Sequence, residues 1–85
     1  MAVYRAFVTI TLKKGVLDSQ GKAVASSLHD MGYGKLEEVR VGRYVELALE
    51  AASHDEALTM TESICDDLLV NDLIEERRIE VVTGP

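Results

Sequence analysis

The stretch VYRAFVTITL, residues 3–12, decides the fold because apolar and polar residues alternate along it. Every even position from Tyr4 to Leu12 is apolar, whereas the odd positions carry Arg5, Thr9 and Thr11. A period of two residues is typical of a β-strand, in which successive side chains point to opposite faces of the sheet. The stretch therefore predicts a strand with one buried face.

The odd face of this strand is only half polar, since Val3 and Phe7 also lie on it. A sheet that is apolar on both faces is usually covered on both. Two interpretations stay open: a second copy of the chain covers this face, or Phe7 is a scattered exposed aromatic residue.

The residues after the strand predict a helix from about Ser19 to Met31. Apolar residues recur at helical spacing from Val24 to Met31. Asp18 is a favourable N-cap, because its carboxylate can accept from an unpaired N–H of the first turn. Gly32 supplies the left-handed conformation in which many helices end.

A second alternating block covers residues 36–51 and is interrupted at Gly42 and Arg43. A two-residue turn there would place the Glu46 carboxylate on the apolar face, which disfavours it. Two arrangements keep the alternation intact and both remain open. One is a hairpin with a three-residue turn at 42–44, and the other is a single long strand bent at Gly42.

The second half of the chain repeats the order of helix and strand. Ser53 and Glu56 have the spacing of a capping box, and helical spacing then continues to about Val70. The segment Arg78–Val82 alternates as a last strand, and residues 83–85 are expected to be a frayed tail.

This order predicts an α+β protein. With the middle block split, the order is βαββαβ, which packs as a two-layer ferredoxin-like sandwich with both helices on one sheet face. The 85 residues amount to 9.3 kDa. A chain of this size buries about 60% of its surface, which suffices for one core. We therefore expect a single domain over residues 1–85.

Charge and hydropathy exclude two classes of partner. Nine Lys and Arg residues stand against 15 Asp and Glu, a net charge of −6. Since a phosphate backbone is recognised by clustered basic residues, we expect no nucleic-acid partner. No apolar run approaches the ~20 residues that cross a bilayer, so we expect no membrane. The N-terminus lacks a signal-peptide pattern and Cys65 is the only cysteine, which together predict a cytoplasmic location.

Residues with chemical potential are few. His29 and His54 are best interpreted as solvated surface residues, and Cys65 as a core residue on an apolar helix stripe. The glycines form no phosphate-binding motif. We therefore expect no catalytic residue, no bound cofactor and no metal site in this chain.

Two segments are not explained by folding alone. In residues 13–22, Leu17 is apolar within a polar loop, which indicates either a docking contact or a hydrophobic staple before the helix. In residues 39–44, Arg40 and Arg43 flank a bend in an otherwise acidic chain. They could dock a carboxylate or phosphate, or they could simply solvate an edge strand.

These segments, KGVLDSQGKAV at 14–24 and VRVGRYVEL at 39–47, closely resemble the PurS family, the small subunit of phosphoribosylformylglycinamidine synthase. The resemblance extends over nearly the whole chain. It departs where the family often has proline, at Lys14 and Ser19. Proline would pre-set the first helical position, so its replacement is expected to loosen the entry to the helix without altering the fold.

The resemblance implies a non-catalytic accessory subunit of this glutamine-dependent C–N ligase (EC 6.3.5.3) of de novo purine (IMP) biosynthesis. In that family PurL binds ATP and the ribonucleotide, PurQ releases ammonia, and PurS forms a dimer, or a dimer of dimers, that bridges them and supports ammonia transfer. ATP and Mg are then used by the complex and not held by this subunit. Partner contacts are expected at nine residues of the two segments: Gly15, Val16, Leu17, Asp18, Gln20, Gly21, Arg40, Gly42 and Arg43.

Two other classes share this order of elements. A dimeric regulatory module of ACT type would bind a small ligand such as an amino acid. A small enzyme of ferredoxin-like fold would turn over a substrate alone, which the lack of a nucleophile with an adjacent base disfavours.

Overall fold

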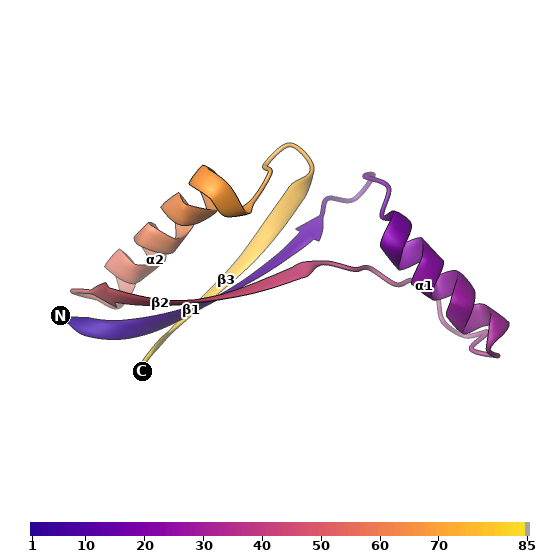
Figure 1. The fold of residues 1–85 in the computed structure, drawn as a ribbon, viewed down its shortest axis with the longest axis horizontal. Helices are drawn as coiled ribbons and strands as arrows, with labels where there is room; N and C mark the ends of the chain where they lie inside the picture. Colours follow the sequence, from indigo (N-terminus) through magenta and orange to yellow (C-terminus); the bar gives the residue numbers. More distant parts are fainter. Residues whose placement is uncertain (85) are drawn as a thin grey trace.

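The computed structural model describes residues 1–84. In this part of the chain, three strands form one sheet, one helix lies against it and a second helix projects from it (Figure 1). The elements are β1 (Ala2–Leu12), α1 (Ser19–Asp30), β2 (Arg43–Ala51), α2 (His54–Ile64), the π-helical turn η1 (Cys65–Leu69) and β3 (Glu75–Thr83).

The strand β1 is the centre of the sheet, in the order β2-β1-β3, and both neighbours run antiparallel to it. Val8 lies opposite Val45 on one side and Ile79 on the other. Because β2 and β3 are parallel to each other and joined through α2, the three strands with α2 form a split βαβ unit. The predicted α+β class is therefore confirmed, and the sheet is antiparallel on both sides of β1.

The core lies between the even face of β1 and the helical segment α2–η1. Ala6 and Val8 are fully buried, and Cys65 from η1 packs against the cluster around Val8. Ala57 of α2 packs on Ala6 in a second cluster. The predicted alternation of β1 and the core position of Cys65 are confirmed. Burial raises the pKa of the Cys65 thiol, which keeps it protonated.

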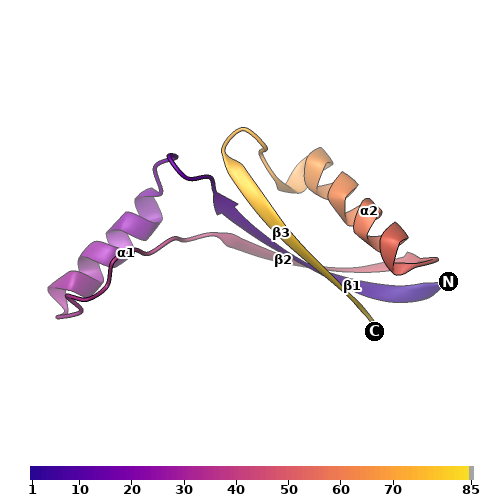
Figure 2. The same cartoon turned by 180° about the vertical axis from the view of Figure 1, so that it is seen from behind.

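The odd face of the sheet carries an aromatic pair from two strands. The rings of Phe7 on β1 and Tyr44 on β2 are stacked, with centroids 6.3 Å apart and planes inclined by 12°. Tyr44 remains 61% exposed, and within residues 1–84 no helix covers this face (Figure 2). The chain alone therefore leaves an aromatic patch in solvent.

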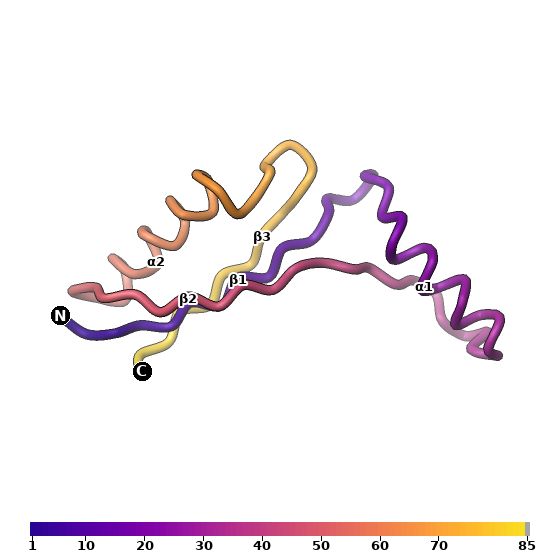
Figure 3. Tube along the Cα trace, in the orientation of Figure 1, coloured from indigo at the N-terminus to yellow at the C-terminus, as the bar shows by residue number. Residues whose placement is uncertain are grey.

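The middle block does not form the hairpin that a three-residue turn would give. It is one extended run, of which the regular strand β2 begins only at Arg43 (Figure 3). At Gly42 the run passes so close to β1 that an added Cβ would lie 2.3 Å from the Ile10 carbonyl oxygen. The alternative of one long strand bent near Gly42 is closest to the structure.

The expectation that both helices cover one sheet face is correct for α2 only. Within residues 1–84, α1 packs against no other helix or strand, and Figure 1 shows it standing apart from the sheet. The chain that returns from α1 folds back on the helix instead: the His29 ring contacts the Leu36 carbonyl at 2.7 Å. Leu28 is half-buried beside Tyr33 and Leu36, so part of the apolar stripe is covered locally.

Two predicted ends differ from the structure. The helical spacing that continues to Val70 belongs to α2 and η1 together, and η1 ends with the Val70 N–H donating to the Cys65 carbonyl at 3.0 Å. Residues 83 and 84 are not frayed, because Thr83 is paired with Tyr4 and the Gly84 N–H donates to the Val3 carbonyl at 3.0 Å. The remaining tail residue, Pro85, lies outside the described residues.

The projecting helix makes the molecule long. Its extents are 52 × 27 × 15 Å and its radius of gyration is 16.5 Å, whereas a compact domain of 85 residues has a radius of about 12 Å. The accessible surface is 6035 Å², against roughly 5,000 Å² for a monomer of this mass. The chain exposes more surface than a self-contained domain of its size.

The close approach at Gly42 gives the first prediction. Gly42→Ala should lower the free energy of unfolding by about 1–3 kcal/mol, because the new methyl group must displace the backbone of β1. Chemical denaturation followed by circular dichroism measures this. Gly34→Ala is the matched control, since a Cβ there meets no atom within 4 Å. Equal stability of the two variants would contradict the packing at Gly42.

Candidate functional site

We call α1 together with the return chain to residue 38 the arm. The two segments singled out in the sequence, residues 13–22 and 39–44, meet where the arm joins the sheet. Asp18 lies at this junction. One carboxylate oxygen accepts from the Gly21 N–H at 2.9 Å and caps α1. The other accepts from the Val41 N–H at 2.8 Å. A single side chain therefore links the chain that enters the arm to the chain that leaves it.

Gly21 is required by this arrangement. It is the buried residue of α1, and an added Cβ would lie 2.4 Å from the Asp18 carboxylate and 2.4 Å from the Val39 carbonyl oxygen. Glycine costs up to about 1 kcal/mol relative to alanine within a helix. The close approach of the return segment explains why this helix carries glycine in its first turn.

The hydrogen bonds make Asp18 a stable anion. The Gly21 N–H, followed by the Val41 N–H, holds the pKa of the Asp18 carboxyl below its ordinary value of 3.8, and the Arg40 guanidinium acts in the same direction. Hydrogen bonds to a carboxylate favour its charged form. The link between the two segments is consequently fully formed at neutral pH.

Arg40 connects the return segment to the sheet. Its guanidinium donates to the Leu12 carbonyl at the end of β1, and the same group lies 3.6 Å from the Glu76 carboxylate on β3. Both partners are exposed to solvent, so the ion pair contributes little to stability by itself. Its geometric effect is to fix the return segment against the strand end.

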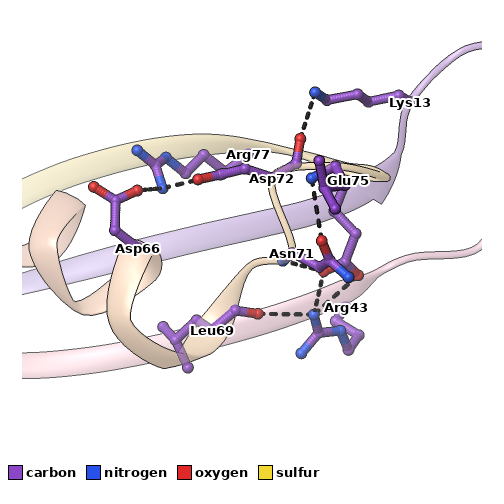
Figure 4. A network of polar contacts seen from close by, with 9 residues as sticks. Lys13, Arg43, Asp66, Leu69, Asn71, Asp72, Glu75 and Arg77 are labelled. Atoms are coloured by element: carbon purple, nitrogen blue, oxygen red, sulfur yellow. Dashed lines mark hydrogen bonds and ion pairs between the residues drawn. The ribbon is translucent and has the colours of Figure 1, made fainter.

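Arg43 has internal partners as well (Figure 4). Its guanidinium donates to the Leu69 carbonyl at 2.8 Å and to the Glu75 carboxylate at 2.9 Å. The Asn71 N–H donates to the same carboxylate at 2.8 Å. The Asn71 N–H, followed by Arg43, holds the pKa of Glu75 below its usual value of 4.5. Arg43 thus joins β2 to the turn between η1 and β3.

A second set of contacts in Figure 4 secures the same turn. The Lys13 side-chain ammonium donates to the Asp72 carbonyl. The Lys13 backbone N–H donates to the Ile74 carbonyl at 2.8 Å. Arg77 lies 2.7 Å from the Asp66 carboxylate, which raises the pKa of the Arg77 guanidinium. The loop that leads to the arm is therefore bound to the turn that leads to β3.

Leu17 is not used in these contacts. It is 65% exposed, so the hydrophobic-staple interpretation, which requires its burial on α1, is wrong. The docking interpretation of Leu17 stays a prediction. Gln20 is also exposed, and Gly15 has a φ of +90° in the turn closed by the Val16 N–H and the Lys13 carbonyl at 3.1 Å.

All nine predicted contact residues lie around this junction, and eight of them, all except Gly21, line two open clefts. One cleft, of about 380 Å³, holds Leu17, Asp18, Gln20, Gly42 and Arg43 among its lining residues. The other, of about 470 Å³, is lined by Gly15, Val16, Asp18 and Arg40, and by residues that the sequence analysis did not single out as contacts: Leu12, Lys13, Lys14, Lys22, Glu38 and Val39. For Lys13, Lys14 and Lys22, the signal in the sequence was the basic character of residues 13–22 in an acidic chain.

The remaining candidates from the sequence are the two histidines, His29 and His54. The His54 ring contacts the Val81 carbonyl at 3.1 Å, and both histidines are exposed, as predicted. Among residues 1–84, no group of three His, Cys, Asp or Glu side chains could hold a metal ion. No helix in the same range is long and apolar enough to span a bilayer.

The geometry defines a class of protein: a small α+β module with a projecting helical arm, in which the residues singled out from the sequence fix the arm to the sheet. Residues 5–83 match the family model PurS, described as phosphoribosylformylglycinamidine (FGAM) synthase. The chain belongs to the PurS family.

Relatives and solved structures agree with this assignment. The phosphoribosylformylglycinamidine synthase subunit PurS of Bacillus subtilis is 42% identical over 93% of each chain, and that of Synechocystis is 40% identical over 92% of this chain and 78% of the relative. The structure of Thermus thermophilus PurS superposes with a TM-score of 0.85 at 37% identity, covering 98% of this chain and 99% of that one. A chain of PurLQS from Thermotoga maritima has a TM-score of 0.89 at 22% identity, over 96% of this chain and 100% of that one, and so shows the shared fold.

The double role of Asp18 gives the second prediction. Asp18→Ala should speed amide hydrogen exchange of Gly21 and Val41 by at least about tenfold, because both N–H groups lose their acceptor. Amides in the centre of β1 should be unchanged. Asp18→Asn is the control, since its amide oxygen can still accept one of the two bonds.

The pKa of Asp18 predicts the pH at which the link opens. Because the folded-state pKa lies below 3.8, the contribution is complete above pH 3.8 and is lost as the pH falls through the lower, folded-state value. The amide proton shifts of Gly21 and Val41 should titrate together, with a midpoint below 3.8. A midpoint at or above 3.8, or separate midpoints, would contradict the shared carboxylate.

Proposed function

We propose that this chain is the accessory PurS subunit of a phosphoribosylformylglycinamidine synthase in de novo purine biosynthesis. It has no catalytic residue of its own, bridges the PurL synthetase and the PurQ glutaminase, and supports the transfer of ammonia between them. The single observation that carries the proposal is membership of the PurS family over residues 5–83.

The shape of the chain supports a bridging role. The chain presents two separate surfaces, one on the sheet and one on α1. The Asp18 link and Arg40 fix the arm in position relative to the sheet. Ammonia released by one subunit must reach another before it equilibrates with water, and this requires partners held in a fixed geometry. A rigid, elongated module suits this task. The PurLQS structure of Thermotoga maritima, one chain of which has the same fold as this chain, is a precedent for the assembly.

The proposal includes a homodimer, or a dimer of dimers. The isolated chain leaves the stacked Phe7 and Tyr44 rings on an uncovered sheet face, and Val24 and Met31 exposed on the arm. Exposed apolar surface beyond that of an ordinary monomer is typical of subunits of an oligomer. A second copy would cover these faces by a closed, symmetric contact.

ATP and Mg are used by the complex in this proposal, with no cofactor held by this subunit. The proposed location is the cytoplasm. Supporting this, the chain's only cysteine, Cys65, is buried and unpaired in the core, a state that suits a reducing compartment.

The test is assembly with purified cognate PurL and PurQ, followed by size-exclusion chromatography and native mass spectrometry. We expect a ternary complex that forms only when this chain is added. Leu17→Asp should weaken that complex at least about tenfold, because it places a charge in a docking contact. Leu68→Asp is the matched control: Leu68 is 85% exposed but lies on η1, outside the junction.

Two outcomes separate the parts of this proposal. Absence of a ternary complex with active cognate subunits would overturn the accessory role. A complex that the Leu17 and Leu68 variants form equally well would keep the role and remove the loop from the contact surface.

A further inference from the structure

The cleft of about 470 Å³ at the junction gathers four of the nine basic residues of the chain. Lys13 and Lys14 come from the loop after β1, Lys22 from the first turns of α1, and Arg40 from the return segment. Three separate segments therefore direct positive charge to one concave surface of an acidic protein.

Two carboxylates, Asp18 and Glu38, also line the cleft. Four cations and two carboxylates give the lining a formal charge of +2, within a chain of −6. Both carboxylate oxygens of Asp18 already accept backbone N–H groups, and its negative charge is included in this sum. Charges more than about 8 Å away are largely screened at physiological ionic strength. The local potential is thus set by the cleft and not by the net charge.

The four cations are not equally engaged. Arg40 lies 3.6 Å from Glu76 and donates to a backbone carbonyl, and Lys13 donates to the Asp72 carbonyl, which leaves its charge uncompensated. Among residues 1–84, Lys14 and Lys22 form neither an ion pair nor a side-chain hydrogen bond. Two ammonium groups of the cleft are therefore available to an external anion.

The geometry points to a binding site for a small phosphate-bearing molecule in this cleft, with Lys14 and Lys22 as its anion ligands. Lysine binds phosphate as a point charge without requiring a fixed fork geometry. The volume lies in the range of about 300–1,000 Å³ that small-molecule sites occupy. Half-buried Leu12, Val16 and Val39 supply apolar contacts for the uncharged part of such a molecule.

A small anion fits better than a long one. A polyanionic strand or an extended acidic peptide would extend beyond the cleft. Outside it, the ligand would meet the surface of a chain in which 15 carboxylates outnumber nine cations. Like charges repel such a ligand along most of its length. A compact phosphate compound stays within the cationic lining. The site requires no residue of PurL or PurQ, since its lining belongs to this chain, and it shares Gly15, Val16, Asp18 and Arg40 with the predicted partner contacts.

The experiment is a titration of the full chain with inorganic pyrophosphate, followed by amide chemical shifts. Saturable shifts are expected in residues 13–16, at Lys22 and at 38–40, and the affinity should fall as NaCl is raised. The double variant Lys14→Gln with Lys22→Gln should bind at least about tenfold more weakly, because it loses both unpaired cations. Both lysines are exposed, so circular dichroism should show an intact fold.

Lys35→Gln is the matched control. Lys35 is an exposed lysine of the same arm, but it lies at the tip beside Tyr33 and outside the cleft. It should leave pyrophosphate binding unchanged. The proposal is overturned if no saturable shift appears up to about 10 mM pyrophosphate. That concentration would nearly saturate a site with a dissociation constant of about 1 mM. The proposal is also overturned if the Lys35 variant loses as much affinity as the double variant.

Discussion

The position of the arm depends on one carboxylate. Asp18 accepts hydrogen bonds from Gly21 on the way into the arm and from Val41 on the way out. Since α1 packs on no other helix or strand of residues 1–84, no hydrophobic contact with the sheet can hold it in place. A hydrogen bond is directional and short-ranged, and so it can fix an angle that apolar packing would leave undefined. Gly21 follows from this constraint, because the return segment lies where its Cβ would be.

The sheet and the arm are stabilised in different ways. The sheet buries a small core of Ala6, Val8 and Ile10 under α2 and η1, and its stability comes from burial and from the β1 ladders. The arm has local helix contacts and polar links, which contribute less and are individually weak. At the junction several such links act together and hold the arm at a fixed position relative to the sheet. Polar links at the junction would then transmit the position of one partner to the other.

Local patterns in the sequence predicted the parts of the fold that local physics determines. The two-residue period of β1 and the capping residues Asp18 and Ser53 each act within a few residues, and each was predicted correctly. The projecting arm was not predicted, because whether α1 packs on the sheet depends on long-range placement that an apolar stripe does not reveal. The internal roles of Arg40 and Arg43 were also missed: the bend at Gly42 was visible in the sequence, but not the carbonyls of Leu12 and Leu69 that accept from these side chains. Among the nine predicted contact residues, Leu17 is the one exposed large apolar side chain.

If this chain acts through its shape and not through chemistry of its own, it should matter for the delivery of ammonia and not for its use. The most direct measurement compares amidation of formylglycinamide ribonucleotide by PurL and PurQ with glutamine or with an ammonium salt as the nitrogen source, each with and without this chain. Turnover with glutamine should depend on the chain, whereas turnover with ammonium should be the same in its presence and absence. An equal requirement for the chain with both nitrogen sources would contradict a purely structural role and would place the chain in the chemistry of the synthetase.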